Sequence, residues 1–347
     1  MTSEKPRRQP RPSIPKESGL LQRARRFLRE HFPGQVPHLV VGYSGGKDSL
    51  ALLLVLRELD RLGACRRTAA HVDHRLRPDS AEAADRAMAV LGELGVRCVL
   101  KTAQVSLRKA HPGQSVEDIA RRFRYQQLTR VVEEVGADAI AVGHHRGDQV
   151  ETVLLHILRG SGLTGLRGML PDSLLAVTWM QKPGFGPATR VRIVRPFLDE
   201  PPETLDELVA ASGLPVIEDP TNVEPVFTRN RVRHELLPLI EDIAPGSTGR
   251  LVALADIAHE DDLALDQVAS MLLDRSLDGA SLVWETMQGA PTGLRRRVVR
   301  LWLLRFSEVD ELSLDRVDAV IELAMRGQGG KQVDIGDRWR VHHLSGQ

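Results

Sequence analysis

A glycine turn between an apolar run and a helical pattern is the feature that most constrains this chain. Residues His38–Leu50 read HLVVGYSGGKDSL, and their short β-branched run predicts a buried strand. Ser44, Gly45 and Gly46 then form a turn, and Leu and Ala dominate the helical pattern over 50–62. A strand, a glycine turn and a helix N-terminus present free backbone N–H groups and a positive dipole end to an anion. The alternative is an ordinary turn whose glycines serve close packing.

Asp48 is unexpected in an anion site, because its carboxylate repels phosphate unless a cation lies between them. A Mg²⁺ ion between Asp48 and a triphosphate removes this conflict, and Ser44 and Ser49 add hydroxyl groups to the turn. The turn is not a Walker A loop, in which Ser or Thr follows the lysine, because Asp48 follows Lys47 here. The segment therefore predicts ATP and magnesium binding by another kind of phosphate loop.

Strand and helix patterns alternate over the first two-thirds of the chain. This alternation predicts right-handed crossovers and a Rossmann-like α/β fold, a mostly parallel sheet with helices on both faces. Ligands of such sheets bind beyond the carboxyl ends of the strands. Three strand ends should therefore converge: Ser44–Ser49, His71–Arg77 and Gly143–Asp148. Besides the first strand and helix, we predict strands at 67–72, 96–101, 139–142 and 192–196, and helices at 20–28, 80–92, 115–135, 148–159 and 202–213.

The second motif with chemical potential is Gly143–Thr152, GHHRGDQVET. Asp148 and Glu151 are three residues apart and therefore share one helix face. The two carboxylates could merely complement the helix dipole as capping groups. Capping alone does not explain the two adjacent histidines that precede them. His144 and His145 are either metal ligands together with Asp148 or part of ATP chemistry, and the nearby glycine turn favours the second.

Arginines alternate with other residues at 229, 231 and 233, before a helical run. They form either a solvated helix start or a clamp for phosphate or carboxylate groups. From residue 246 the pattern predicts helices without strands, at 251–273, 294–306 and 312–325, then a hairpin within 332–344. We expect four parts: a disordered basic tail (1–18), an adenylation domain (19–245), a smaller helical domain (246–330) and a C-terminal hairpin (331–347).

The composition of the chain says more about the compartment in which it works than about the reaction it catalyses. The formal net charge is +1, which argues against a strongly basic nucleic-acid coat, although residues 1–35 hold nine basic and three acidic side chains. Two cysteines without a C-x-x-C motif exclude a cysteine-ligated cluster and favour a reducing compartment. No apolar run approaches a membrane span, so we expect a cytoplasmic protein without a membrane partner.

The combined motifs resemble the tRNA(Ile)-lysidine synthetase family of the PP-loop ATP pyrophosphatase superfamily. The glycine turn is similar to the PP-loop S-G-G-x-D-S. The resemblance runs in the family's order over residues 38–240, and more weakly over the helical region. The matching segments are Ser44–Ser49, His71–Arg77, Ala120–Tyr125, Gly143–Thr152, Arg159–Met169 and Asp219–Pro238.

The resemblance implies that ATP adenylates O2 of the wobble cytidine in a minor tRNA(Ile) with a CAU anticodon. The amine of L-lysine then attacks carbon 2, giving lysidine, AMP and diphosphate. It assigns ATP binding to Ser44, Gly45, Gly46, Lys47, Asp48, Ser49, His71 and Asp73, and magnesium binding to Asp48 and Asp148. Lysine binding falls to Asp148 and Glu151, and catalysis to Asp48, Arg124, His144, Asp148 and Glu151. RNA contacts fall to Arg229, Asn230 and Arg233, with Arg296 and Arg300 added from the helical region.

Two departures and several alternatives remain open. Gly147 stands where many relatives carry an Asp, and the further C-terminal domain of many relatives is not evident. The base that deprotonates lysine is either His144 or a carboxylate, and a homodimer is one option for the assembly. The alternatives are a cytidine thiolase, whose relatives use cysteine pairs, a small-molecule adenylating ligase, and a non-catalytic tRNA-binding protein.

Overall fold

The computed structural model describes residues 14–15, 17–76, 79–107, 115–177, 189–217, 228–306, 312–327, 329–336 and 339–344. The chain divides into two compact units, which are described separately. Among described residues, the first unit holds 14–160, 168–177 and 189–253, and the second holds 161–167 and 254–344. In the described part of the chain, no helix is both long enough and apolar enough to cross a bilayer.

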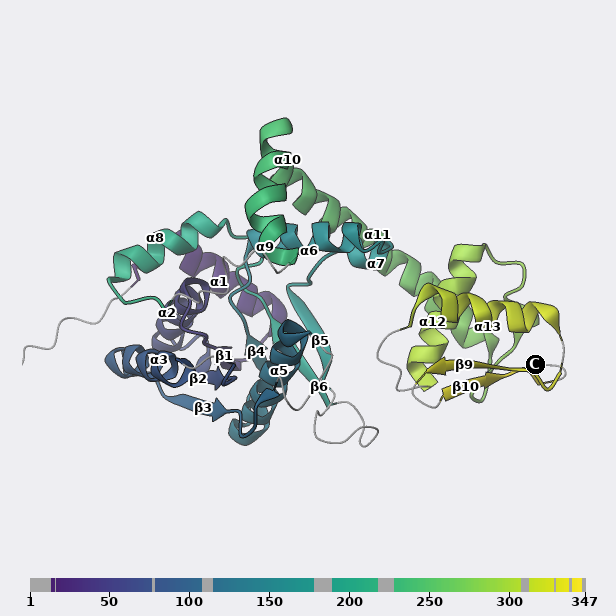
Figure 1. The fold of residues 1–347 in the computed structure, drawn as a ribbon, viewed down its shortest axis with the longest axis horizontal. Coiled ribbons are helices and arrows are strands. Elements are labelled where there is room, and N and C mark those ends of the chain that lie inside the picture. The colour runs from purple at the N-terminus through teal and green to yellow at the C-terminus, as the bar shows by residue number, and fades with distance from the viewer. Residues whose placement is uncertain are drawn as a thin grey trace, which may run out of the picture. The chain divides into compact units, whose positions relative to one another are not determined.

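A six-stranded sheet organises the first unit, in the order β3-β2-β1-β4-β6-β5 (Figure 1). Five strands are parallel, and β5 pairs antiparallel with β6 at the edge. The predicted parallel α/β sheet is therefore confirmed, whereas β5 was missed. The strands are β1 (His38–Gly42), β2 (Arg66–Asp73), β3 (Cys98–Thr102), β4 (Ala139–Ala141), β5 (Asp172–Val177) and β6 (Thr189–Val194).

Alternating side chains of the central strand enter separate hydrophobic clusters on the two faces of the sheet. Leu39 and Val41 pack with α1, α2, α3 and α8, while Val40 packs with α5 on the opposite face. Helices on both faces are therefore confirmed, as the period-two burial of a parallel sheet requires. These helices are α1 (Gly19–His31), α2 (Lys47–Arg61), α3 (Ser80–Leu94), α5 (Val116–Val135) and α8 (Pro202–Ser212).

The first unit continues beyond the sheet in helices that pack on α6 (Arg146–Leu158). Val150 and Leu154 of α6 form a buried cluster with Val232 and with apolar residues up to Val252. The partners come from a π-helical turn (Val232–Leu236), α10 (Leu237–Ile243) and the start of α11 (Ser247–Ser276); the short α9 (Thr228–Arg231) precedes them.

The N-terminal segment differs from the predicted disordered tail over its last residues. Ile14 is 8% exposed and belongs to the cluster formed by α1 and α2. Residues 1–13 and 16 lie outside the described residues, as do residues 178–188. The disordered tail is therefore wrong at Ile14, because its apolar side chain is buried with the core.

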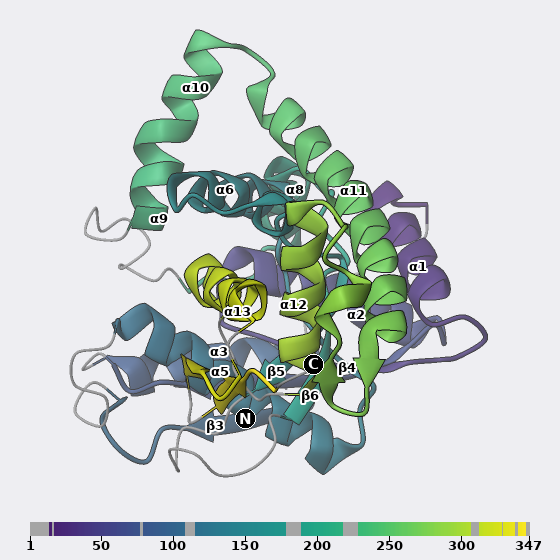
Figure 2. The same ribbon diagram turned by 90° about the vertical axis from the view of Figure 1, so that its right-hand side faces the viewer.

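The second unit is mainly helical, with two small strand pairs. Helices α12 (Thr292–Phe306) and α13 (Leu314–Arg326) pack against each other, and α13 contacts the hairpin of β9 (Gln332–Gly336) and β10 (Trp339–His342) (Figure 2). The predicted hairpin is confirmed. The expectation of no strands before it is wrong, because β7 (Leu277–Asp278) and β8 (Ser281–Leu282) pair after α11. A single helical turn, α7 (Leu163–Leu166), and a 3₁₀ turn, Trp284–Thr286, complete the unit.

Candidate active site

The glycine turn after β1 is held in shape by its own hydroxyl groups. The helix α2 begins at Lys47, three residues earlier than the sequence pattern indicates. The Ser49 hydroxyl donates to the Gly46 carbonyl (2.8 Å) and accepts from the Ser44 backbone N–H (3.2 Å). The Ser44 hydroxyl lies 3.1 Å from that of Ser49 and accepts from the Gly46 N–H at 3.3 Å. Both serines therefore support the turn besides offering polar groups to a ligand.

The end of β2 supports the same turn from the neighbouring strand. His71 donates from Nδ1 to the Tyr43 carbonyl at 2.8 Å, directly before the turn, and burial lowers the pKa of His71. The Asp73 carboxylate accepts from the Arg75 backbone N–H at 2.9 Å. Both His71 and Asp73 are 7% exposed. The two strand ends therefore converge as predicted.

The third strand end approaches the turn through a glycine. A Cβ on Gly143 would lie 2.6 Å from the Asp48 carbonyl oxygen, so no larger residue fits without displacing backbone. This contact brings the first turn of α6 next to the first turn of α2. The predicted convergence of the segments at 44–49, 71–77 and 143–148 is therefore confirmed for their described residues.

His145 lies between the two aspartates that were predicted to hold magnesium. Its Nε2 is 3.7 Å from Asp48 Oδ1 and 3.6 Å from Asp148 Oδ2. Its Nδ1 accepts the Gly147 backbone N–H at 3.0 Å, so in the neutral ring the proton resides on Nε2, facing both carboxylates. A Cβ on Gly147 would lie 2.8 Å from the His145 ring. The departure at Gly147 thus makes room for this histidine, which the sequence analysis names beside His144 but does not include among the site residues it assigns.

Asp48 and Asp148 have opposite electrostatic surroundings. Burial raises the pKa of Asp48, and the His145 ring only partly offsets this. Its Oδ1 is buried and has no hydrogen-bond partner among the described residues. Burial also acts to raise the pKa of Asp148, but His145, His144 and Arg229 more than reverse it and leave that pKa lowered.

Two arginines bind both acids of α6, Asp148 in its first turn and Glu151 in its second, although the sequence pattern predicts both in the first turn. Arg229 donates to Glu151 Oε2 at 2.7 Å and to Asp148 Oδ1 at 3.1 Å. Arg233, one turn later, donates to Glu151 Oε1 and, at 3.3 Å, to Asp148 Oδ1. Glu151 is 2% exposed, so its charge is compensated almost entirely by this pair. Of the two sequence interpretations, these contacts are those of a carboxylate clamp, and the solvated helix start is wrong for Arg229 and Arg233.

His144 is partly buried and lies near arginines as well as near Asp148. Arg195 donates from Nε to His144 Nδ1 at 3.3 Å and from Nη1 to the Leu170 carbonyl at 2.6 Å. Burial, reinforced by Arg195, Arg124 and Arg229, lowers the pKa of His144 to about 3 although Asp148 opposes the shift. The ring is therefore neutral at pH 7 and carries its proton on Nε2. The sequence analysis missed Arg195 because no motif marks this residue, which directly follows β6 and precedes Pro196.

Arg124 supplies a further positive charge near His144. Its guanidinium lies 5.4 Å from the ring centre of Tyr125, and burial lowers its pKa. Arginine side chains nevertheless stay charged in proteins. In the described part of the chain, no ion pair joins Arg124 to a carboxylate. Lys47, by contrast, pairs with Asp206 of α8 at 2.7 Å, and both side chains are 47% exposed.

The remaining predicted residues lie in α9 and in the second unit. Arg296 forms a bidentate pair with Asp318, each contact 2.7 Å. Arg300 donates to the Leu312 carbonyl at 3.2 Å, and Asn230 belongs to α9 beside Arg229. None of these contacts tests RNA binding, which stays a prediction for all five residues.

Two alternatives of the sequence analysis lose their basis here. No three His, Cys, Asp or Glu side chains of the described segments are arranged to hold a metal by themselves. The described segments therefore give no support to a metal site made by His144, His145 and Asp148. Cys65 and Cys98 are free thiols, and burial raises their pKa to about 12 and about 11, which disfavours the thiolates a thiolase cluster needs.

Comparisons with known proteins match both units. Residues 20–240 match the PP-loop domain family, and residues 283–344 match the TilS substrate binding domain. A protein of Nocardia farcinica named tRNA(Ile)-lysidine synthase is 36% identical over 90% of this chain and 90% of its own length. One of the same name from Deinococcus deserti is 37% identical over 67% of this chain, but the match spans only 40% of that protein.

Solved structures support the fold. The U34-tRNA thiolase NcsA from Methanococcus maripaludis, with its [4Fe-4S] cluster, aligns with a TM-score of 0.54 at 17% identity. The alignment covers 75% of this chain and 89% of the thiolase. At this identity the likeness extends to the arrangement of helices and strands, not to the cluster.

Proposed function

Because the chain belongs to the tRNA(Ile)-lysidine synthase family of PP-loop proteins, we propose that it joins L-lysine to the wobble cytidine of a tRNA(Ile). The reaction uses ATP to adenylate O2 of cytosine, releases diphosphate, and ends with lysidine and AMP. The observation that carries this proposal is the meeting of the glycine turn with the acids and arginines around α6 at one end of the sheet. ATP, lysine and tRNA share the cytoplasm, where we place the protein.

The turn 44–49 suits the phosphates of ATP, and Asp48 suits a magnesium ion that accompanies them. Its buried Oδ1, which lacks a hydrogen-bond partner in the described chain, is an oxygen ligand of the kind that Mg²⁺ prefers. Asp148 would be the second ligand, with its Oδ2 near the same histidine. Bound there, the ion would neutralise charge on the phosphates as diphosphate leaves. Lys47 is half exposed in its pair with Asp206, so the lysine can leave Asp206 and bind a phosphate at little cost in free energy. His71 and Asp73 shape the wall beside the turn.

The α6 acids and their two arginines suit a free amino acid. L-lysine carries ammonium groups and a carboxylate, and Asp148, Glu151, Arg229 and Arg233 present both complementary charges within one cluster. Binding lysine there would replace part of the existing ion pairs with equivalent ones. This keeps each buried charge compensated throughout, because an uncompensated one would be costly.

His144 and Arg124 suit the charge that develops on the base and phosphate. With Nδ1 occupied by Arg195, the neutral His144 can donate from Nε2 but is a weak proton acceptor. We therefore assign the proton released by the lysine amine to a carboxylate, and assign hydrogen-bond donation to His144. Arg124 has no carboxylate partner in the described chain, so its charge remains available for an anionic intermediate.

The test is diphosphate release by the full chain with ATP, L-lysine and tRNA(Ile) bearing CAU, each omitted in turn. The proposal requires release that depends on this tRNA, and lysidine that forms only when lysine is present. Release with a small molecule in place of tRNA would instead identify a small-molecule ligase. Absence of any release with all three substrates, under conditions where the chain is folded and binds tRNA, would favour the non-catalytic alternative.

A further inference from the structure

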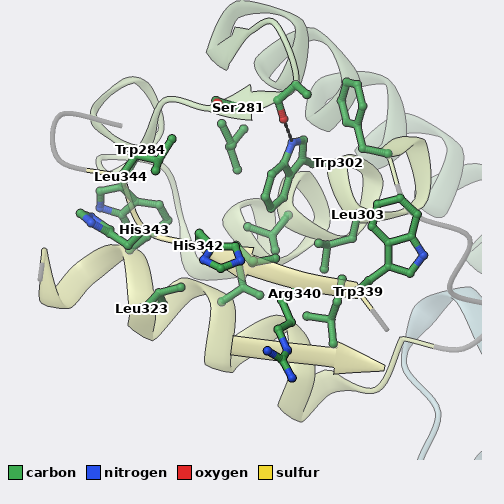
Figure 3. A pocket seen from close by; sticks show the side chains of 18 residues that line it. Ser281, Trp284, Trp302, Leu303, Leu323, Trp339, Arg340, His342, His343 and Leu344 are labelled. Carbon is green, nitrogen blue, oxygen red and sulfur yellow. Dashed lines mark hydrogen bonds between the residues drawn. The ribbon is translucent and has the colours of Figure 1, made fainter. Parts of the chain in front are cut away.

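The second unit contains a cavity between α12, α13 and the β9–β10 hairpin (Figure 3). Its lining is chiefly apolar, and the indole N–H of Trp302 is already bonded to the Ala280 carbonyl at 2.9 Å. Nothing in this lining identifies a particular ligand. A buried arginine of the first unit, by contrast, is held by partners that give it a definite task.

Arg195 is a buried charge without a carboxylate partner. The residue directly follows β6 and is 7% exposed. Its side chain forms hydrogen bonds only with neutral groups of the described chain, which are the His144 ring, the Leu170 carbonyl and the Ser173 hydroxyl. Burial of a charge without an opposite charge beside it lowers stability. The arginine is therefore best explained by what it does for one of these partners.

The bond to His144 fixes which ring nitrogen carries the proton. Arg195 donates from Nε to Nδ1 at 3.3 Å, and a guanidinium has no acceptor to offer in return. Nδ1 must therefore be the unprotonated nitrogen, and the proton of the neutral ring stays on Nε2. His144 is only partly buried and has no second hydrogen-bond partner in the described chain, so its Nε2–H can be offered to a ligand. Without Arg195 the ring could take either tautomer.

The segment 168–173 holds Arg195 from its other side. Nη1 donates to the Leu170 carbonyl at 2.6 Å and to the Ser173 hydroxyl at 3.0 Å. The backbone N–H of Arg195 donates to the Pro171 carbonyl at 2.8 Å. Because these bonds use Nη1 and the backbone, Nε remains directed at the histidine.

The same segment is fastened to α6, the helix that carries the acids of the site. Gln149 is 5% exposed, and its amide donates to the Met169 carbonyl at 3.0 Å and accepts from the Met169 N–H at 2.8 Å. A Cβ on Gly168 would lie 2.7 Å from the amide oxygen of Gln149, and the φ of +62° at Gly168 also favours glycine. The segment therefore rests on β6 and on α6, which leaves the guanidinium little freedom to turn away from His144.

We propose that Arg195 is a positioning residue that holds His144 as a hydrogen-bond donor toward an acceptor oxygen of the substrate, and that the segment 168–173 holds Arg195 for this task. The inference rests on the proposed function for the reaction in which the donor is used. With its proton kept on Nε2, His144 can stabilise negative charge on the substrate. It then does not compete with the carboxylates for the proton that lysine releases.

The experiment compares Arg195→Met with Arg195→Lys in the full chain, labelled with ¹⁵N-histidine. Methionine keeps a long unbranched side chain without a donor, whereas lysine keeps the charge and can still donate. The ¹⁵N signals of the two ring nitrogens distinguish the tautomers of a neutral imidazole, and His144→Gln identifies the signals of His144. Arg67→Gln is the matched control, because Arg67 lies on β2 with a side chain only 13% exposed but pairs with Asp60.

We expect wild-type His144 to carry its proton on Nε2 alone. In Arg195→Met the two tautomers should mix, and kcat for lysidine formation should fall by about 10- to 100-fold, within the loss of about 100- to 1,000-fold that removing a donor outright causes. The KM values for ATP and L-lysine should change less than about threefold, because the lost interaction belongs to the transition state. Ser173→Ala, which removes one of the bonds that hold Arg195, should lower kcat by about 2- to 10-fold. The control should match wild type in tautomer and kcat.

Two results would overturn the proposal without any substrate: a wild-type His144 with its proton on Nδ1, and an unchanged single tautomer in the folded Arg195→Met variant. Mixed tautomers with an unchanged kcat would contradict it too, because donation by His144 would then not be used. If Arg195→Lys restores kcat while the tautomers stay mixed, the charge of Arg195 matters and its bond to the ring does not.

Arg195→Met could fail to fold, and the wild-type tautomer and Ser173→Ala then decide. An unchanged kcat in Ser173→Ala would contradict the role of the segment 168–173. A wild type that is folded and binds tRNA but forms no lysidine would overturn the proposed function. The dependence of the tautomer on Arg195 is measured without substrates, so the two failures are distinguishable.

Discussion

The first turns of α2 and α6 lie on opposite sides of one histidine, yet their acids are partnered in opposite ways. Asp48, in α2, has a buried oxygen without a hydrogen-bond partner in the described chain and a raised pKa. Asp148, in α6, accepts from the His145 backbone and from two arginines and has a lowered pKa. Glu151, one turn further along α6, is equally well satisfied.

The difference separates two kinds of functional residue. The Asp48 side chain is 34% exposed, but its buried Oδ1 has no hydrogen bond within the described chain. Ionisation of such a group destabilises the fold, so it is best explained by a ligand that compensates the charge. A buried carboxylate already bound by arginines contributes to the fold as well as to any ligand site, and its loss leaves guanidinium charges behind. Substitutions at the two turns should therefore differ in whether they affect activity alone or activity together with stability.

The largest effect is expected from Asp48→Asn. Amide oxygens and nitrogens cannot replace a charged ligand for magnesium, so tRNA-dependent diphosphate release should fall by about 100-fold or more. The thermal unfolding temperature should not fall, because the substitution removes a charge that partial burial disfavours. Asp85→Asn, an exposed acid on α3, is the control. Near-normal diphosphate release by the Asp48 variant would remove the contrast between the two turns.

Glu151→Gln should affect both lysine use and stability. Gln keeps the shape of the side chain but loses the charge that Arg229 and Arg233 share, so the free energy of unfolding should fall by about 1–3 kcal/mol. The KM for lysine should rise about tenfold while the KM for ATP changes little. Glu207→Gln, exposed on α8, should change neither quantity. If the free energy of unfolding falls while the KM for lysine is unchanged, the role of Glu151 is purely structural.

The pH dependence of stability should have opposite signs at the two aspartates. A raised pKa means that ionisation of Asp48 lowers the free energy of unfolding. The stability of Asp48→Asn relative to wild type should therefore increase as pH rises from about 4 through the pKa that Asp48 has in the folded protein. A lowered pKa means that ionised Asp148 stabilises the fold, so Asp148→Asn should lose most at neutral pH and least in acid. Urea unfolding of the three chains from pH 3.5 to pH 8 measures both, and parallel curves would contradict the comparison.

The smallest effect is expected in the second unit, where Arg296 is paired like the arginines at α6 but at the surface. If Arg296 and Arg300 contact tRNA phosphates, changing both to Ala should weaken binding a few fold. It should also lower the slope of affinity against salt by up to about 0.7–0.9 per lost contact. Asp318→Ala then sharpens the test, because it frees Arg296 and should strengthen tRNA binding. Unchanged salt slopes in both variants would make Arg296 part of the scaffold.

Local patterns predicted the parts of the site that one strand and its following turn determine. The turn 44–49, the end of β2 and the acids of α6 all follow apolar runs, and parallel strands bring such ends together. The strand β5 was missed because its apolar run, Leu174–Val177, is only four residues long and does not alternate with polar residues. Leu174 remains exposed because β5 is the antiparallel edge of the sheet.

Roles that depend on distant partners escaped prediction, even where the sequence analysis named the residue. His145 matters because Gly143 brings α2 within reach and Gly147 leaves room for its ring, and neither fact is visible in local spacing. Arg195 matters because its strand lies beside β4, so that its guanidinium reaches His144. The burial of Ile14 likewise depends on α1 and α2, not on its basic, proline-rich surroundings.

The short segment 161–167, which groups with the second unit although it precedes β5 in the chain, limits how this protein can be divided. Asp262 of α11 is fully buried, and its carboxylate binds Thr164, Arg167 and Arg297. A gene fragment starting at residue 254 would encode the helices of that unit but omit two of these three partners. It would therefore leave a carboxylate with unmet hydrogen bonds inside its core. Recombination or engineering that exchanges the second unit between relatives must transfer 161–167 with it, although nearly ninety residues separate the two pieces.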